Sequence, residues 1–210
     1  MVNETMEQQT HTQTEKTRKY PEMVLIGPVG AGKSTIGQLL VERLQLPGIS
    51  LDEIAEKYYD EMGVGDEVRT RLIKEIGFGA MYQQTTPALA HAVVRMFEDH
   101  DHAVFDLGAG HSHFEDALLF AKVQQALAPC PNVVFLLPSP DLDQSVEILR
   151  ARSIAERGWD WNADGYDYIA HWVKDACNHV LATLTVYTEG RTPAETCEEI
   201  LTRIRPANVR

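Results

Sequence analysis

The sequence predicts an α/β fold, a parallel sheet with helices on both faces. Short apolar runs without polar alternation recur along the chain, as in strands that are buried on both sides. Helical spacing of apolar residues fills the stretches between these runs. A glycine-rich motif at residues 27–34 joins the first run to the first helical stretch. Together these features indicate the three-layer sandwich of P-loop NTPases, which bind ligands beyond the carboxyl ends of the strands.

Five runs are predicted to form the sheet, and amphipathic helices separate them. The runs are Met23–Ile26, Ile49–Leu51, Ala103–Leu107, Val133–Leu137 and Leu184–Thr188. Three of the expected helix faces consist of Ile36, Leu39, Leu40 and Leu44; of Leu142, Val146 and Leu149; and of Ile169, Trp172, Val173, Ala176 and Val180. The last helix should begin at Thr192-Pro193-Ala194-Glu195, a capping box with proline in the first helical position.

Composition limits the classes of function. The 19 Lys and Arg residues against 31 Asp and Glu give a net charge of −12, which argues against a general nucleic-acid binder. No apolar run approaches the roughly 18 residues of a membrane span, so no membrane partner is expected. Three scattered cysteines suit neither a disulfide framework nor a CxxC zinc site, so we expect reduced thiols in a cytoplasmic protein.

The chain is expected to form one domain behind a polar tail. Residues 1–19 are almost without apolar side chains and are predicted to be a disordered tail. The P-loop kinase-like domain is then predicted over 20–210, as a monomer or a weak homodimer.

The motif at residues 27–34 carries the most specific chemistry. Gly27-Pro28-Val29-Gly30-Ala31-Gly32-Lys33-Ser34 matches GxxxxGK[ST] between a predicted strand and a predicted helix. In such loops the N–H groups of residues such as Gly30, Ala31, Gly32 and Thr35 cradle phosphates, aided by the positive end of the helix. Lys33 would neutralise the β- and γ-phosphates, and Ser34 would offer its hydroxyl to Mg²⁺. The cofactors expected are therefore a nucleoside triphosphate and Mg²⁺, and the absence of an NKxD base-reading motif favours ATP.

Residues 22–205 resemble the shikimate kinase family and its relatives among small-metabolite kinases. The segment GPVGAGKSTIGQLLVERL, a short strand and an Asp carry the resemblance, with Gly108-Ala109-Gly110 where the family has three glycines. The family implies a five-stranded parallel sheet in the order 2-3-1-4-5 and a mobile lid after the fourth strand. It also implies that Asp52 grips the hydroxyl of the acceptor and that Gly108, Ala109 and Gly110 line the acceptor pocket.

Two departures from the family lie at positions that hold the carboxylate of shikimate. Tyr82 stands near the place of one family arginine, and Lys174 near the place of a second. Lysine keeps the charge of arginine and loses its bidentate fork, so the exchange is not conservative. We therefore list Tyr82 and Lys174 as substrate-site residues and predict that shikimate is used poorly or not at all.

The metal is expected to depend on Asp106. The first Asp of the family's Asp-x-Asp, associated with the metal, is Ser50 in this chain. Asp106 ends an apolar strand as in a Walker B motif, so it is predicted to support Mg²⁺ together with Ser34. A turn-capping aspartate is the alternative.

Two histidines follow the glycine turn. His111 or His113 could contact the acceptor, act as a base or be a plain loop histidine. They lie two apart, which is not a shared helix face, and no third ligand is evident, so a zinc site is not expected.

The segment after the fourth strand corresponds to the family lid. Arg152 and Arg157 could close over the phosphates there, with Arg157 as the catalytic candidate, and solvated ion pairs are the alternative. Trp159 and Trp161 could cover a sugar-like ring or anchor the loop.

Two functions follow from these residues. The first is an ATP-dependent kinase that phosphorylates a hydroxyl of a small polar metabolite, with Lys33, Asp52 and Arg157 as catalytic residues. The second is an ATP-binding or ATPase module whose acceptor site has decayed. Asp52, the glycine turn and the lid arginines favour the kinase.

Overall fold

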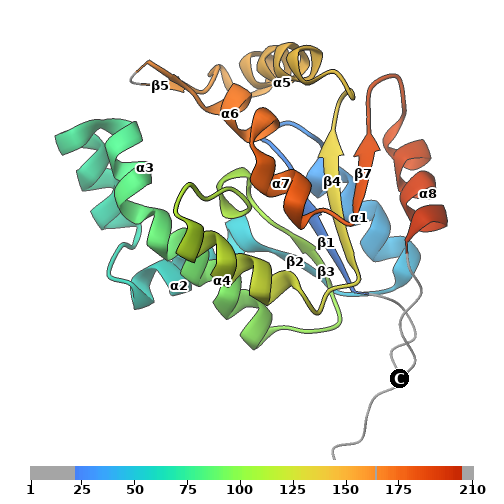
Figure 1. Cartoon of the computed structure of the whole chain (residues 1–210), viewed down its shortest axis with the longest axis horizontal. Helices are drawn as coiled ribbons and strands as arrows, with labels where there is room; N and C mark the ends of the chain where they lie inside the picture. Colours follow the sequence, from blue (N-terminus) through green and yellow to red (C-terminus); the bar gives the residue numbers. More distant parts are fainter. Residues whose placement is uncertain (1–21, 164, 205–210) are drawn as a thin grey trace, which may run out of the picture.

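The computed structural model describes residues 22–163 and 165–204, which form a three-layer α/β domain (Figure 1). Its central sheet has five parallel strands in the order β2-β3-β1-β4-β7. Counting only the strands of this sheet, that is the predicted order 2-3-1-4-5. The strands are β1 (Met23–Ile26), β2 (Gly48–Ser50), β3 (Val104–Asp106), β4 (Asn132–Leu137) and β7 (Leu184–Tyr187). The predicted tail at residues 1–19 lies outside the described residues.

The sheet is the core of the domain. Every residue of β1 and β4 is buried, which agrees with their unbroken apolar sequences. The strand β1 pairs with β3 from Met23↔Val104 and with β4 from Met23↔Asn132, so it lies at the centre. Since all five strands run in parallel, their carboxyl ends meet at one edge, where the loops of the site begin.

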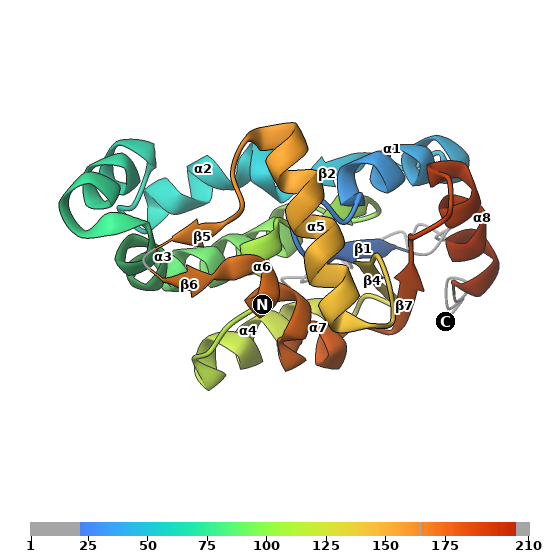
Figure 2. The ribbon, with the colours of Figure 1, turned by 90° about the horizontal axis from the view of Figure 1, so that it is seen from above.

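Helices cover both faces of the sheet (Figure 2). α1 (Lys33–Leu44) and α8 (Pro193–Arg203) lie on one face, and α4 (Ala117–Leu127) and α7 (Ala176–Leu181) lie on the other. The remaining helices are α2 (Leu51–Glu61), α3 (Asp66–Asp99), α5 (Leu142–Arg157) and α6 (Tyr168–Lys174), with a short 3-10 turn η1 (Ala109–His111). The capping box at Thr192 and Glu195 is present as predicted.

Helix α3 is two helices joined across a kink. Gly77 has φ of 84° and ψ of 166°, which interrupts the helical path within the 34 residues of α3. The second half begins with Phe78 and Tyr82, which the kink turns toward the site. This break was not predicted from the sequence.

The prediction of one continuous helix over 169–180 was wrong, because this segment forms two helices, α6 and α7. Asp175 has extended backbone angles and ends α6, and its carboxylate caps α7 by accepting from the Cys177 N–H. Val180, predicted to face the core, is 56% exposed because the second helix takes a new direction. Leu51 likewise begins α2 instead of ending a strand.

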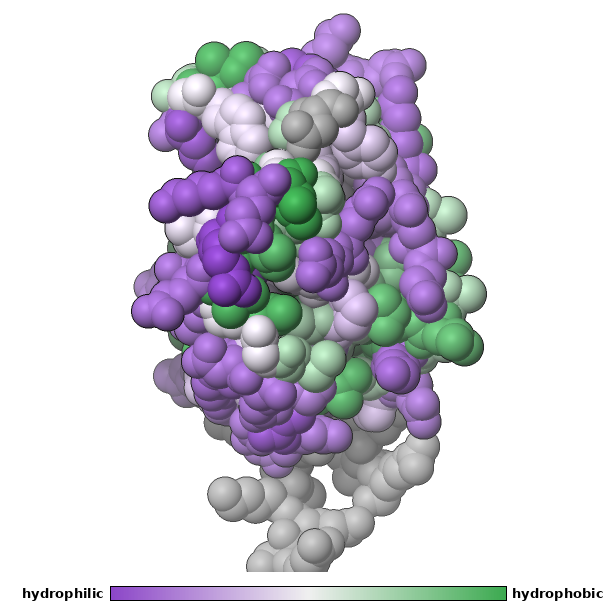
Figure 3. Space-filling model, turned by 90° about the vertical axis from the view of Figure 1, so that its left-hand side faces the viewer, coloured by the Kyte–Doolittle hydropathy of each residue, from purple (hydrophilic) through white to green (hydrophobic). Residues whose placement is uncertain are grey.

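The lid segment contains a small antiparallel hairpin. Strands β5 (Asn162–Ala163) and β6 (Tyr166–Asp167) pair next to α6. Figure 3 shows the side of the molecule where the hairpin and α3 lie, a mostly polar surface with apolar patches between the polar side chains. No helix in the described ranges is long and apolar enough to cross a membrane.

Candidate active site

The loop between β1 and α1 has the backbone that the phosphate motif requires. Gly27 has φ of +144°, and a Cβ there would lie 2.6 Å from the backbone oxygen of Leu136 in the next strand. Only glycine fits such a close approach. Residues Gly30, Gly32, Lys33, Ser34 and Thr35 line a cavity of about 410 Å³ at the N-terminus of α1. Ala31, also predicted to bind the cofactor, is a buried part of the same loop.

Lys33 is folded onto its own loop. Its Nζ donates to the backbone oxygens of Gly27 at 2.9 Å and Pro28 at 3.1 Å. The side chain is buried, and burial lowers its pKa, while the carboxylates of Asp106 and Asp52 act in the opposite direction. A cation held in this way lies ready for an anion that enters the loop.

Ser34 and Asp106 lie together across the end of the sheet. The Ser34 hydroxyl donates to Asp106 Oδ2 at 2.8 Å. The other oxygen of that carboxylate, Oδ1, is buried and has no hydrogen-bond partner among the described residues. Burial raises the pKa of Asp106, and Lys33 and Ser34 oppose this shift.

This oxygen pair fits Mg²⁺. Magnesium takes oxygen ligands and usually binds through one or two carboxylates plus phosphates and water. Ser34 Oγ and the free Oδ1 of Asp106 are such ligands, and an ion there would supply charge to bridge and neutralise phosphates. Ser50 ends the neighbouring strand opposite Asp106 and is neutral.

Asp52 lies in the first turn of α2 and opens toward the same cavity. Its side chain is 70% exposed, and its Oδ1 is 3.8 Å from Nδ1 of His111. It lines the cavity together with Lys33 and Ser34. A carboxylate in this place can accept a hydrogen bond or a proton from a hydroxyl group in the cavity.

The glycine turn forms η1, and it lies against Tyr82. A Cβ on Gly110 would lie 2.8 Å from the buried hydroxyl of Tyr82, so a larger residue there would push the tyrosine side chain aside. Ala109 and Gly110 line the cavity, and Gly108 packs beside Asp52. Burial raises the pKa of Tyr82 to about 12, so the side chain is a neutral phenol.

His111 is held inside the domain. Its Nε2 lies 2.6 Å from the hydroxyl of Tyr59, and its ring stacks parallel to the tyrosine ring. Burial lowers the pKa of His111, which favours the neutral imidazole. The position of Tyr59 beside His111 was not predicted, because Tyr59 belongs to the buried face of α2 and no motif marks it.

The two lid arginines lie at different places. Arg152 donates from Nη1 to the backbone oxygen of Gly30 at 3.2 Å, so it supports the loop from outside the cavity. Arg157, the last residue of α5, lines the cavity directly. Arg157, the predicted catalytic arginine, is thus the one of these two that lines the cavity, and its catalytic role stays a prediction.

The lid tryptophans pack with α3. Trp159 and Trp161 stack with ring centroids 4.3 Å apart, and Phe78 meets both edge-on. Trp161 also lines the cavity, while its ring contacts Trp172 of α6. The pair therefore anchors the lid, and Trp161 in addition forms part of the cavity wall.

Lys174 is not brought to this cavity. It is an exposed residue at the end of α6, and its Nζ pairs with Asp143 Oδ1 at 2.6 Å. The residues that line the cavity do not include it.

A second and larger cavity, of about 690 Å³, adjoins the first at Tyr82. Residues of α3, of the loop after η1, of β6 and of α6 line it, among them Gln83, Glu115, Tyr166 and His171. This larger cavity was not predicted, because the segments that line it lie far apart in the sequence.

Comparison with known proteins identifies close relatives. A shikimate kinase of Streptomyces coelicolor is 31% identical over 197 residues, which are 86% of this chain and 94% of that protein. A shikimate kinase of Rhodococcus jostii is 37% identical over 90 residues, 43% of this chain and 47% of that protein. No protein-family model matches the chain.

Solved structures share the fold. The shikimate kinase of Acinetobacter baumannii in complex with shikimate superposes with a TM-score of 0.56 at 20% identity, covering 88% of this chain and 93% of that one. A gluconokinase of Sinorhizobium meliloti gives a TM-score of 0.51 at 19% identity, covering 88% of this chain and 91% of that one.

Proposed function

The chain belongs to the shikimate kinase family, and from that premise we propose that it transfers the γ-phosphoryl group of ATP to a hydroxyl of a small polar metabolite other than shikimate. The observation that carries the proposal is a single cavity lined by Lys33, Ser34 and the open carboxylate of Asp52. Asp106 joins this arrangement by accepting a hydrogen bond from the Ser34 hydroxyl. A phosphate donor and a hydroxyl acceptor can meet in such a space.

The reaction divides among these residues. The loop N–H groups and Lys33 would hold the β- and γ-phosphates, and Ser34 and Asp106 are the residues that would hold Mg²⁺, which would supply positive charge to the phosphates. Asp52 accepts a hydrogen bond from the attacking hydroxyl and takes its proton as the new P–O bond forms. The bond from the γ-phosphorus to the β–γ bridging oxygen breaks, and Arg157 stabilises the charge that spreads over the transferring group.

The choice of a different acceptor is supported by the two exchanged positions. The relative from Acinetobacter baumannii was solved with shikimate, an acid. In this chain Tyr82 is a neutral phenol, and Lys174 pairs with Asp143 outside the cavity. The similarity to the gluconokinase of Sinorhizobium meliloti shows only that the two proteins share a fold.

A non-transferring ATP-binding module is the second candidate, favoured by the same two positions. Acceptor-dependent turnover separates the two functions. Purified protein with MgATP would be assayed for ADP release with no acceptor and with hydroxy acids, sugars, sugar acids and nucleosides. A rate that rises with one class and yields its phosphate ester supports the kinase. ATP binding with no acceptor effect across the panel supports the module.

A further inference from the structure

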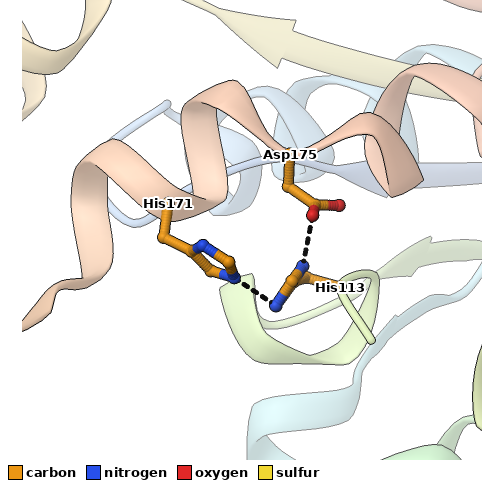
Figure 4. Close-up of side chains that lie close together, drawn as sticks. All are labelled: His113, His171 and Asp175. Carbon is orange, nitrogen blue, oxygen red and sulfur yellow. Dashed lines mark hydrogen bonds and ion pairs between the residues drawn. The ribbon is translucent and has the colours of Figure 1, made fainter. Parts of the chain in front are cut away.

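Two histidines that line the larger cavity, His113 and His171, lie close to an aspartate, Asp175. One donor atom from each of His113, His171 and Asp175 lies within 4.8 Å of the other two (Figure 4). They come from the loop after η1, from α6 and from the break between α6 and α7. None of them belongs to the phosphate loop or to the Ser34–Asp106 pair.

The two imidazole rings face each other through Nε2. His113 and His171 are in contact at these atoms, and their planes are perpendicular. On its other side, Nδ1 of His113 lies 3.1 Å from Asp175 Oδ2. A carboxylate there favours the proton on Nδ1, which leaves the lone pair of Nε2 directed at His171.

We propose that His113 and His171 bind a divalent transition-metal ion of the zinc class through their Nε2 atoms, with Glu115 as an oxygen ligand and Asp175 orienting His113. Imidazole nitrogen and carboxylate oxygen are the ligands that such ions select, whereas Mg²⁺ prefers oxygen alone. A ligating histidine almost always gives its second N–H to a carboxylate. Asp175 Oδ2, 3.1 Å from Nδ1 of His113, is close enough to take this role, and that nitrogen has no hydrogen-bond partner in the described ranges.

The surroundings fit an ion. His113 is only 4% exposed, so its ring is fixed, while His171 and Glu115 open to the cavity and give an ion a path of entry. The carboxylate of Glu115 lies 3.9 Å from Nε2 of His171, close enough to move into contact with a shared ion. The carboxylates of Glu115 and Asp175 beside the two imidazole rings would also offset the charge of a divalent cation.

A bound ion would tie three segments together. His113 follows the glycine turn, and His171 and Asp175 hold α6 and the start of α7. In the absence of an ion, one ring must donate a proton to the other, so a simple histidine–histidine hydrogen bond is the competing explanation. The experiment must therefore detect the ion directly, and it does not depend on phosphoryl transfer.

The test is calorimetric titration of the full chain with Zn²⁺, after treatment with a chelator and in excess Mg²⁺. We expect one zinc per chain and a higher melting temperature. His113→Gln and His171→Gln should each abolish this site. Asp175→Asn, which can still cap α7, should weaken zinc binding by roughly 10–100-fold. The control His179→Gln changes an exposed histidine on α7 and should bind as the wild type does.

A thiol is the main alternative ligand nearby. Cys177 lies two residues after Asp175, and its Sγ contacts the backbone oxygen of Phe114. Cys177→Ser should retain zinc binding, and Co²⁺ bound to the wild type should lack the charge-transfer absorption of a thiolate ligand. This spectrum needs no variant, so it keeps the test valid even where a histidine variant unfolds.

Three results would overturn the proposal. They are no stoichiometric zinc binding by the wild type, wild-type affinity in both folded histidine variants, and a thiolate signal that disappears in Cys177→Ser. The first two favour the plain hydrogen bond, and the third assigns the ion to the cysteine.

Discussion

At Lys33 a positive charge is buried in the loop that it is expected to serve. Among the described residues its amine has only backbone oxygens as hydrogen-bond partners, so its place is better explained by an incoming phosphate than by packing. We predict that Lys33→Ala abolishes turnover and weakens ATP binding by about 10–100-fold, the loss of one charge-assisted interaction. Titration with an ATP analogue measures the affinity.

The matched control is Lys174→Ala, which removes an exposed lysine outside the cavity. It should leave ATP affinity and the circular dichroism spectrum unchanged. Wild-type affinity in a folded Lys33→Ala protein would contradict the role of the loop.

The two carboxylates of the site should fail in different ways. Asp106 is tied to Ser34 and lies on the metal side, whereas Asp52 is open to the cavity. We predict that Asp106→Asn raises the Mg²⁺ concentration needed for half-maximal rate with every acceptor. Asp52→Asn should instead lower acceptor-dependent turnover and spare MgATP binding. Should the Mg²⁺ requirement respond to Asp52→Asn alone, the two roles are reversed.

The raised pKa of Asp106 predicts a pH effect on the metal. Burial lifts the pKa of this carboxyl above its ordinary 3.8, so the folded protein takes up the proton at a higher pH than the unfolded chain does. As the pH falls through that raised value, Mg²⁺ has to compete with a proton and its apparent affinity drops. The same group affects stability in the opposite direction. Because the folded protein binds this proton more tightly than the unfolded chain does, the free energy of unfolding increases as the pH falls toward 3.8.

A Mg²⁺ titration at several pH values measures this effect. Asp106→Asn carries no titrating group at this position and serves as the control. An equal pH dependence in the variant would assign the effect to another group.

At the level of the elements, α8 begins at a complete capping box. Thr192 Oγ1 accepts from the Glu195 N–H, and the Glu195 carboxylate accepts from the Thr192 N–H. We predict that Thr192→Ala lowers the free energy of unfolding by about 1 kcal/mol, the usual loss for a threonine cap. Urea denaturation measures the change.

Thr202→Ala is the control within the same helix. Thr202 is exposed, and its hydroxyl donates to a carbonyl oxygen within the helix, so its loss should change stability by less than about 0.5 kcal/mol. Equal losses in both variants would show that the cap contributes nothing specific.

Two breaks in helices help to position side chains at the site. The kink at Gly77 turns Phe78 and Tyr82 toward the lid and the glycine turn, and the break at Asp175 brings a carboxylate to His113. Apolar spacing predicted neither break: the expected face ran from Ile169 to Val180 across Asp175, whereas Val180 is exposed, and no residue of α3 before Gly77 is buried. Gly77 was visible in the sequence, but an isolated glycine is often tolerated within a helix.

At the scale of the whole molecule, features encoded in a short stretch of sequence could be predicted, whereas contacts between distant segments could not. The phosphate loop and the cap of α8 are each encoded within about ten residues, and the resemblance to a known family supplied the order of the strands, which is confirmed. The pairing of His113 with His171 spans 58 positions and was not predicted. Spacing defines which residues share a face of one element, and it does not define which faces of two elements meet.

The acceptor site is such a long-range product, with walls from α3, η1, β6, α6 and the lid. Selectivity therefore depends on what all these segments place in one cavity. The resemblance implies that family members hold the carboxylate of shikimate with two arginines. Here those positions carry a tyrosine whose hydroxyl is buried and a lysine paired outside the cavity. No residue at these two positions offers the bidentate fork of arginine.

We predict that shikimate is a poor acceptor for this protein. Each lost charge-assisted hydrogen bond costs roughly 1.5–3 kcal/mol, so two would lower kcat/KM by roughly 10²–10⁴-fold relative to a well-matched acceptor. Steady-state rates with shikimate and with the best acceptor of the panel measure this ratio. The variant Tyr82→Phe keeps the aromatic ring beside Gly110 and adds no cation, so it should not restore the use of shikimate. Efficient phosphorylation of shikimate by the wild type would contradict the prediction and require another cation, with Arg157 of the lid the first to test, because it already lines the cavity.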